Sequence, residues 1–169
     1  RKRILSFIAP EVADPRGVGS NWNRNQALIA VGSGGLTGKG YGKGLQAGLG
    51  YLPQAVAHND FIFAMIGEEW GFLGVLFVVV LYTLIVLVGF RIASRAPDAF
   101  GELLAIGCSS LIALQAILHM AVGLALAPPT GLSLPLVSFG RSNLIMTLVA
   151  LGILISVARA TPGGKAAYA

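Results

Sequence analysis

Three long apolar runs dominate the pattern of hydrophobic and polar positions in this chain. The first covers about residues 61–90 and carries only Glu68 and Glu69 as charged side chains. The second and third cover about residues 102–127 and 142–159. Because about 20 apolar residues suffice to cross the hydrocarbon core of a bilayer, each run is long enough for one transmembrane helix. The pattern predicts an all-α integral membrane protein with three transmembrane helices, followed by a tail at residues 160–169.

The composition agrees with this prediction and excludes a soluble globular domain. Apolar residues make up 55% of the chain and charged residues 11%, with a mean hydropathy of +0.77. A soluble domain carries about 25% charged residues. The chain opens on three basic residues without an initiator methionine, so we expect it to be the C-terminal part of a longer protein. Cys108 is the only cysteine, which excludes a disulfide within the chain.

Residues 1–60 differ from the rest of the chain. They hold seven Lys or Arg against three acids, and nine glycines fall between Gly32 and Gly50, interleaved with Lys39 and Lys43. Glycine lets backbone amides approach an anion, and lysine supplies charge, so the segment suits phosphate groups. A turned loop with its lysines on lipid headgroups is the alternative. The spacing matches neither a Walker motif nor a dinucleotide fingerprint, and no nucleic-acid partner is expected.

Asp60 lies at the entrance to the first apolar run, after Pro53 and directly after His58 and Asn59. Asp is a favoured N-cap residue, so capping the helix is the structural interpretation. A carboxylate at a membrane surface could also accept a proton from a sugar hydroxyl. Both roles remain open at this point.

Glu68 and Glu69 lie inside the first run, where acids are tolerated only when they are paired, hydrated or functional. Neighbouring residues on a helix point about 100° apart, so the two acids cannot use the same partner. We interpret both as structural polar groups, one facing the bundle interior and the other a basic or backbone partner.

Prolines punctuate the segment between the second and third runs, which ends at Arg141. Such an irregular apolar segment needs protein or water around its backbone, which predicts a re-entrant or interfacial loop packed on other helices. Arg141 could bind a phosphate or carboxylate, or extend to the headgroups. Gln115 and His119 share a helix face and predict a polar contact between helices.

The positive-inside rule gives conflicting answers on orientation. Counting all basic residues places residues 1–60 inside, but the rule weakens for loops of about 60 residues. The shorter elements hold Arg91, Arg95, Arg159 and Lys165 on one side and Arg141 on the other. We therefore expect residues 1–60 outside and the C-terminus in the cytoplasm.

Several long motifs, in order along most of the chain, resemble the SEDS family, the RodA/FtsW group. They are QALIAVGSGGLTGKG at 26–40, YLP at 51–53, HNDFIFA at 58–64, GEE at 67–69 and PTGLSLPLVSFG at 129–140. The resemblance implies the C-terminal portion of a ten-helix protein of the bacterial inner membrane, with a large Gly/Lys-rich extracytoplasmic loop at residues 1–60. Asn59 stands where the family usually has Thr, and Arg141 where it has a second Gly. The motifs leave division and elongation types both open, with YLP and GEE favouring division.

The activity that the resemblance implies is glycosyl transfer, which polymerises lipid II into peptidoglycan with release of undecaprenyl diphosphate. The family's essential loop carboxylate falls on Asp60, which would be the general base. Charge makes Lys39, Lys43 and Arg141 candidates for binding the substrate, together with His58; a divalent cation, Mg²⁺ or Mn²⁺, is the alternative source of positive charge. The implied partner is a class B penicillin-binding protein, docked on the first two helices. A lipid II flippase and a non-enzymatic scaffold are the alternative functions.

Overall fold

The computed structural model describes residues 20–44, 61–128, 130–138 and 140–160, and its regular structure there is entirely helical. Three helices are long and apolar enough to cross a membrane, which confirms the three predicted spans. In chain order the helices are α3 (Ser20–Ser33), α6 (Ile62–Ala93), α7 (Ala99–Gly123) and α8 (Arg141–Ala160).

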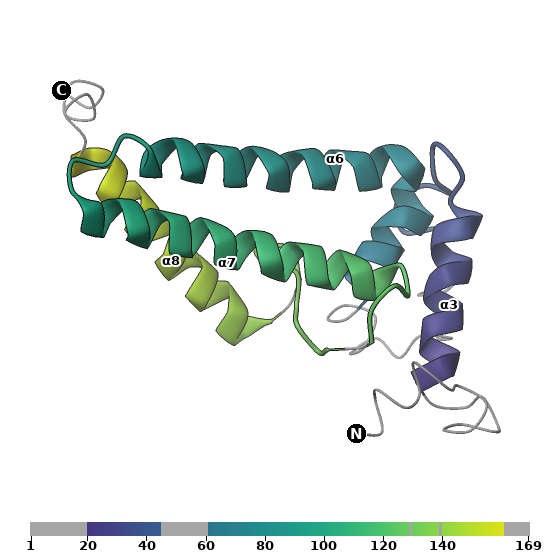
Figure 1. The fold of residues 1–169 in the computed structure, drawn as a ribbon. Coiled ribbons are helices and arrows are strands. Elements are labelled where there is room, and N and C mark those ends of the chain that lie inside the picture. Colours follow the sequence, from purple (N-terminus) through teal and green to yellow (C-terminus); the bar gives the residue numbers. More distant parts are fainter. Residues whose placement is uncertain (1–19, 45–60, 129, 139, 161–169) are drawn as a thin grey trace.

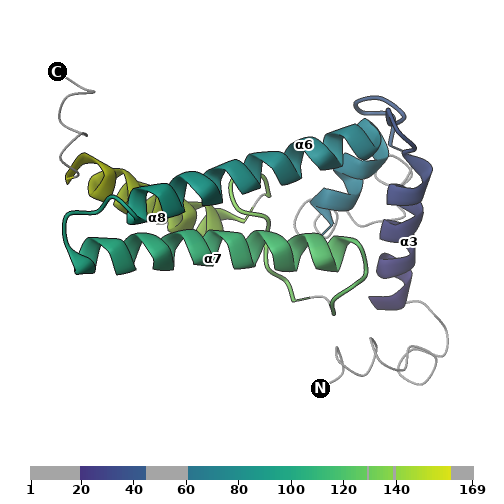
Figure 2. The ribbon, with the colours of Figure 1, turned by 45° about the horizontal axis from the view of Figure 1, so that its top comes forward.

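The three spanning helices form a bundle in which α6 and α7 lie side by side and α8 packs against α7 (Figures 1 and 2). Its core is made of small and medium-sized side chains from all three helices, among them Val78, Ala105, Ile112 and Leu154. Large apolar side chains on the outer faces of the same helices are exposed, as expected for surfaces that meet lipid or further helices.

The second spanning helix begins and ends earlier than the expected range of 102–127. Asp98 precedes α7 and accepts a hydrogen bond from the amide of Gly101 at 3.0 Å, which fixes the start of the helix. At the other end α7 stops at Gly123, and Ala125 has a positive φ of 58°. Proline disfavours the helical conformation of the residue before it, so the chain leaves the helix before Pro128.

The helix α6 is broken at Gly71, where φ is 66° and ψ is −160°. Residues 72–93 alone are long enough, at 1.5 Å per residue, to cross a hydrocarbon core of about 30 Å. Residues 62–70 turn away across the end of the bundle and lie beside α3 (Figure 1). The expectation of one continuous helix over 61–90 is therefore wrong, and Glu68 and Glu69 precede the spanning part.

A helix, α3, occupies part of the region that was expected to be a loop. Its buried residues Ala27 and Ala30 pack against Phe61, Ala64 and Met65. Small side chains on α3 allow this close contact with the first part of α6. The resulting layer, α3 with residues 62–70, lies across one end of the three-helix bundle (Figure 2).

Candidate functional site

The break at Gly71 exposes backbone groups on both of its sides, and residues 34–44, here called the glycine loop, satisfy four of them. The amides of Phe72 and Leu73 donate to the carbonyls of Gly35 and Leu36, at 2.9 and 3.2 Å. In the opposite direction, the amides of Lys39 and Gly40 donate to the carbonyls of Glu68 and Glu69, each at 3.0 Å. Helix ends leave such groups without partners inside the helix. The glycine loop therefore joins the two parts of α6.

Glycines make this contact possible because two backbones approach each other closely. A Cβ added at Gly34 would lie 1.9 Å from the carbonyl oxygen of Gly67, and one at Gly38 would lie 2.1 Å from that of Glu69. A Cβ at Gly71 would lie 2.4 Å from the amide nitrogen of Gly38. The glycines that suggested a phosphate site thus approach the backbone of α6.

A salt bridge accompanies the backbone contact. The Nζ of Lys39 lies 2.8 Å from Oε1 of Glu68, whose side chain is only 1% exposed, whereas that of Lys39 is 28% exposed. A buried carboxylate loses its hydration and needs a charged or hydrogen-bonding partner. The structure places Lys39 in that role and joins the glycine loop to α6 through their side chains as well as their backbones.

The other charged residues near the break are more accessible. Glu69 is partly exposed and Lys43 is exposed, and the amide of Lys43 donates to the carbonyl of Gly40 within the glycine loop. Lys43 therefore lies on the surface of the loop, where its side chain is accessible to a ligand.

His58 and Asp60 lie outside the described residues. After the gap at residues 45–60, the described residues resume at Phe61, which is 4% exposed and packs with α3 and α7. Helix α6 begins at Ile62 and its N-cap position is Phe61, which makes no side-chain capping hydrogen bond. The interpretation of Asp60 as a helix cap therefore stays a prediction. Asp60 nevertheless adjoins, in sequence, a residue that the fold holds firmly.

The segment between α7 and α8 is tied to all three spanning helices, as predicted. The hydroxyl of Tyr82 on α6 donates to the carbonyl of Pro135. On α7, His119 Nδ1 lies 2.7 Å from the carbonyl oxygen of Leu132, and Gln115 donates to that of Ser133 at 3.3 Å. These backbone carbonyls and Asn143 of α8 give Gln115 and His119 polar partners within the bundle.

This loop re-enters the bundle and sets the depth at which α8 begins. Gln115 precedes the end of α7 by eight residues, or about 12 Å along the helix, and it hydrogen-bonds Asn143 in the first turn of α8. Arg141, the first residue of α8, is exposed at this level. The glycine loop lies beyond the end of the bundle, whereas α8 begins beside the middle of α7 (Figures 1 and 2). The structure therefore does not bring Arg141 and Lys39 together.

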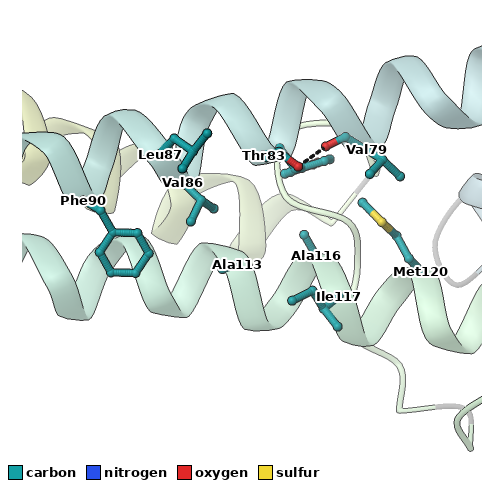
Figure 3. Close-up of a pocket in the computed structure, with 10 residues that line it drawn as sticks. Val79, Thr83, Val86, Leu87, Phe90, Ala113, Ala116, Ile117 and Met120 are labelled. Atoms are coloured by element: carbon teal, nitrogen blue, oxygen red, sulfur yellow. Dashed lines mark hydrogen bonds between the residues drawn. The ribbon is translucent and has the colours of Figure 1, made fainter.

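A groove of about 260 Å³ runs between α6 and α7 within the spanning region (Figure 3). Alanines of α7 form part of its wall, and Thr83 returns its hydroxyl to the carbonyl of Val79 at 2.8 Å, so the groove is almost entirely apolar. Its lining residues are Val79, Tyr82, Thr83, Val86, Leu87, Phe90, Ala113, Ala116, Ile117 and Met120.

Three structurally important residues were not identified from the sequence. Gly71 breaks α6, Tyr82 holds the re-entrant loop, and Arg24 of α3 donates to the carbonyl of Ala125 at 3.2 Å. Gly71 is one of several glycines in the same apolar run, so the sequence held no signal for the first. A hydroxyl-bearing aromatic side chain in an apolar run was a weak signal for the second, and the third had none.

The described part therefore defines a helical membrane protein whose first spanning helix is broken near one end and joined there by a glycine loop. The chain belongs to the FtsW/RodA/SpoVE family, described as cell cycle proteins, whose family model matches residues 1–162.

Similar proteins include two that are named probable peptidoglycan glycosyltransferase FtsW. That of Trichlorobacter lovleyi is 45% identical over 92% of this chain and 39% of its own length, and that of Geobacter metallireducens is 41% identical over 96% and 42%. The stage V sporulation protein E of Bacillus subtilis is 42% identical over 94% of this chain and 42% of its own. The chain thus spans about two fifths of the length of these relatives.

A solved structure supports the fold. It is described as showing the structural coordination of polymerization and crosslinking by a peptidoglycan synthase complex. One of its chains matches with a TM-score of 0.68 and 30% identity, over 94% of this chain and 41% of that one.

Proposed function

We propose that the full-length protein is a glycosyltransferase that polymerises lipid II into glycan strands at the bacterial inner membrane. The observation that carries this proposal is the 45% identity, over 92% of the chain, with a relative named probable peptidoglycan glycosyltransferase FtsW. The family match includes Asp60 and both segments that the structure ties to the spanning helices.

In the proposed reaction, Asp60 accepts the proton of a sugar 4-hydroxyl while that oxygen attacks the anomeric carbon of a second lipid-linked sugar. The new glycosidic bond forms with inversion as the bond to undecaprenyl diphosphate breaks. Negative charge gathers on the departing diphosphate, and nearby cations lower the energy of that state. Lys43 is the best placed of the described lysines for this role, because Lys39 is paired with Glu68. We place His58 and Arg141 among the residues that contact the substrate.

The described residues do not form a metal site of their own. No three His, Cys, Asp or Glu side chains gather in the described ranges. Mg²⁺ and Mn²⁺ are usually bound by carboxylates together with substrate phosphates.

The orientation that we propose places residues 1–60 on the extracytoplasmic side of the membrane and the C-terminus in the cytoplasm. Arg91 and Arg159 lie in the last turns of α6 and α8, and Arg95 lies in the turn between α6 and α7. The connectivity places all three at the end of the bundle opposite the glycine loop (Figure 1). Basic residues in short loops favour the cytoplasmic side.

For the partner, we propose that the membrane anchor of a class B penicillin-binding protein docks on α6 and α7. The apolar groove between these helices supports the proposal, since Ala113 and Ala116 in its wall leave room for the side chains of another transmembrane helix. Membrane lipids cover the remaining apolar surface.

Polymerisation can be tested with the purified full-length protein and its transpeptidase partner in detergent micelles, with fluorescent lipid II. We expect ladders of glycan products. A flippase or a scaffold forms no glycosidic bond, so neither gives a ladder in this assay. If no ladder forms while labelled lipid II crosses proteoliposome membranes, the protein is a flippase and the proposal is wrong.

A further inference from the structure

We propose that the glycine loop and the adjoining part of α6 form a surface that inserts into the lipid interface at this end of the bundle. Its members, here called the interfacial surface, are Leu36 and Tyr41 of the loop with Trp70 and Phe72 of α6. The partner that fits this surface is the bilayer itself, at the boundary between headgroups and hydrocarbon. The depth of the loop in the membrane does not depend on the activity proposed above.

The length of α6 places this surface at the edge of the hydrocarbon core. Arg91 lies in the last turn of α6 and is exposed. An arginine near the end of a spanning helix extends its charge to the headgroups, so Arg91 marks the interface at the far end of the bundle. The opposite edge of a hydrocarbon core lies about 30 Å away, which is about 20 residues of helix. Counting back from Arg91 by that length leads to Gly71, between Trp70 and Phe72.

Large apolar side chains are exposed at this depth on both segments. In the glycine loop, Leu36 is 72% exposed and Tyr41 is 85% exposed. In α6, the exposed fractions are 51% for Trp70 and 57% for Phe72. These side chains lie around one backbone contact and form an exposed apolar patch, and patches of this kind mark a surface that meets another protein or a membrane.

Backbone hydrogen bonds hold the two parts of the interfacial surface together. The carbonyl of Leu36 accepts from the amide of Leu73 at 3.2 Å. The amide of Gly40, which precedes Tyr41, donates to the carbonyl of Glu69 at 3.0 Å. The loop lies on the side of α6 that faces away from α7 (Figures 1 and 2). The interfacial surface therefore continues the exposed outer face of α6 beyond the end of its spanning part.

The residue types of this surface and the charges around it favour lipid over a charged protein partner. Trp and Tyr gather at membrane interfaces because an apolar ring and a polar atom suit the two sides of that boundary. The charges of the glycine loop and of residues 62–70 balance, with Lys39 and Lys43 against Glu68 and Glu69. These two segments therefore offer no net charge to an acidic or basic protein. The exposed Lys43 can extend its ammonium group to headgroup phosphates, as lysines near an interface do.

The test measures the depth of a fluorescent label in the full-length protein, reconstituted in vesicles of phosphatidylethanolamine and phosphatidylglycerol. Bimane is attached in turn through Leu36→Cys and Tyr41→Cys, after the native reactive cysteines have been replaced. Arg95→Cys, in the exposed turn at the opposite end of the bundle, is the control for an interface, and the free bimane–cysteine conjugate is the control for water. Nitroxide lipids quench the label from the headgroup or from carbon 12 of the acyl chain, and iodide quenches it from water. Each measurement is made with and without the transpeptidase partner.

At both loop positions, and at position 95, we expect the headgroup nitroxide to quench at least about threefold more than the carbon-12 nitroxide, which lies near the midplane about 15 Å deeper. Quenching of the loop labels by iodide alone, as for the free conjugate, would place the loop in water. The absence of quenching by all three would place it against protein. Nitroxide quenching that disappears when the partner is added would assign the surface to the partner, and stronger quenching from carbon 12 would place the loop in the hydrocarbon. Any of these four results would overturn the inference.

Discussion

Replacing Gly71 by alanine is expected to detach the glycine loop from α6. The backbone of Gly71, with φ 66° and ψ −160°, lies in a region that is essentially restricted to glycine. The added Cβ would also lie 2.4 Å from the amide nitrogen of Gly38 and 2.7 Å from the carbonyl of Leu36. These are backbone atoms, so they cannot move aside as the end of a flexible side chain could.

The expected cost has two parts. The strained backbone costs about 1–3 kcal/mol. Displacement of the loop breaks the bonds from Phe72 and Leu73 to the loop carbonyls, each worth about 0.5–1.5 kcal/mol. Together these give about 2–6 kcal/mol, and since about 1.4 kcal/mol is a factor of ten, the detached fraction should rise between about 30-fold and 10⁴-fold.

Trypsin cleavage of the full-length protein after Lys39, followed by mass spectrometry, measures this fraction. When the loop recloses faster than it is cut, the cleavage rate follows the population of the open form. Two matched glycines separate the causes, since an added Cβ meets nothing within 4 Å at either one. Gly35 has a positive φ of 57°, so alanine there adds only strain, about 1–2 kcal/mol. Gly32 lies in α3, where alanine adds neither strain nor contact.

The expected order of cleavage rates is Gly71→Ala fastest, then Gly35→Ala, with Gly32→Ala no faster than wild type. If Gly71→Ala were cut after Lys39 no faster than Gly32→Ala, the contact of the glycine loop with α6 would not depend on the break at Gly71, contrary to this prediction.

Two further substitutions test the packing of the bundle through the thermal unfolding midpoint of the full-length protein. Tyr82→Phe removes the hydroxyl that donates to the carbonyl of Pro135 and should cost about 0.5–1.5 kcal/mol; an unchanged midpoint would contradict an anchoring role for that hydroxyl. Gly89→Ala places a Cβ 2.0 Å from the hydroxyl oxygen of Ser109 and should lower the midpoint by separating α6 from α7, whereas Gly107→Ala meets open space. Equal midpoints for the two alanine variants would show that α6 and α7 do not depend on this contact.

The three spans could be predicted because each run is long and continuous, and length decides between a transmembrane helix and other elements. The break at Gly71 could not be predicted from the sequence. Gly74 and Gly89 occur in the same apolar run, and the helix continues through both. Only the approach of the glycine loop, which the run itself does not encode, distinguishes Gly71 from them.

Helix α3 illustrates a second limit. The apolar stretch at residues 27–31 is too short for periodicity to separate helix from strand. Its conformation depends on Ala27 and Ala30 packing against the first part of α6, a contact made across more than thirty residues of chain.

The candidate site was predictable only in part. An acid in an apolar run must have a partner, but the choice of Lys39 for Glu68, with Lys43 close by in sequence, depends on how the glycine loop turns. The role of Asp60 rests on the resemblance of the motif around it. Local pattern alone also allowed a helix cap, and Asp60 lies outside the described residues.

The role of Asp60 is tested most directly by the rate of glycan formation from lipid II by the Asp60→Asn variant of the full-length protein, measured in complex with its transpeptidase partner. The substitution removes the base but keeps the size of the side chain. If Asp60 is the general base, the product ladder disappears while the complex and the binding of lipid II persist. A ladder that forms at the wild-type rate would contradict the assignment of Asp60 as the general base.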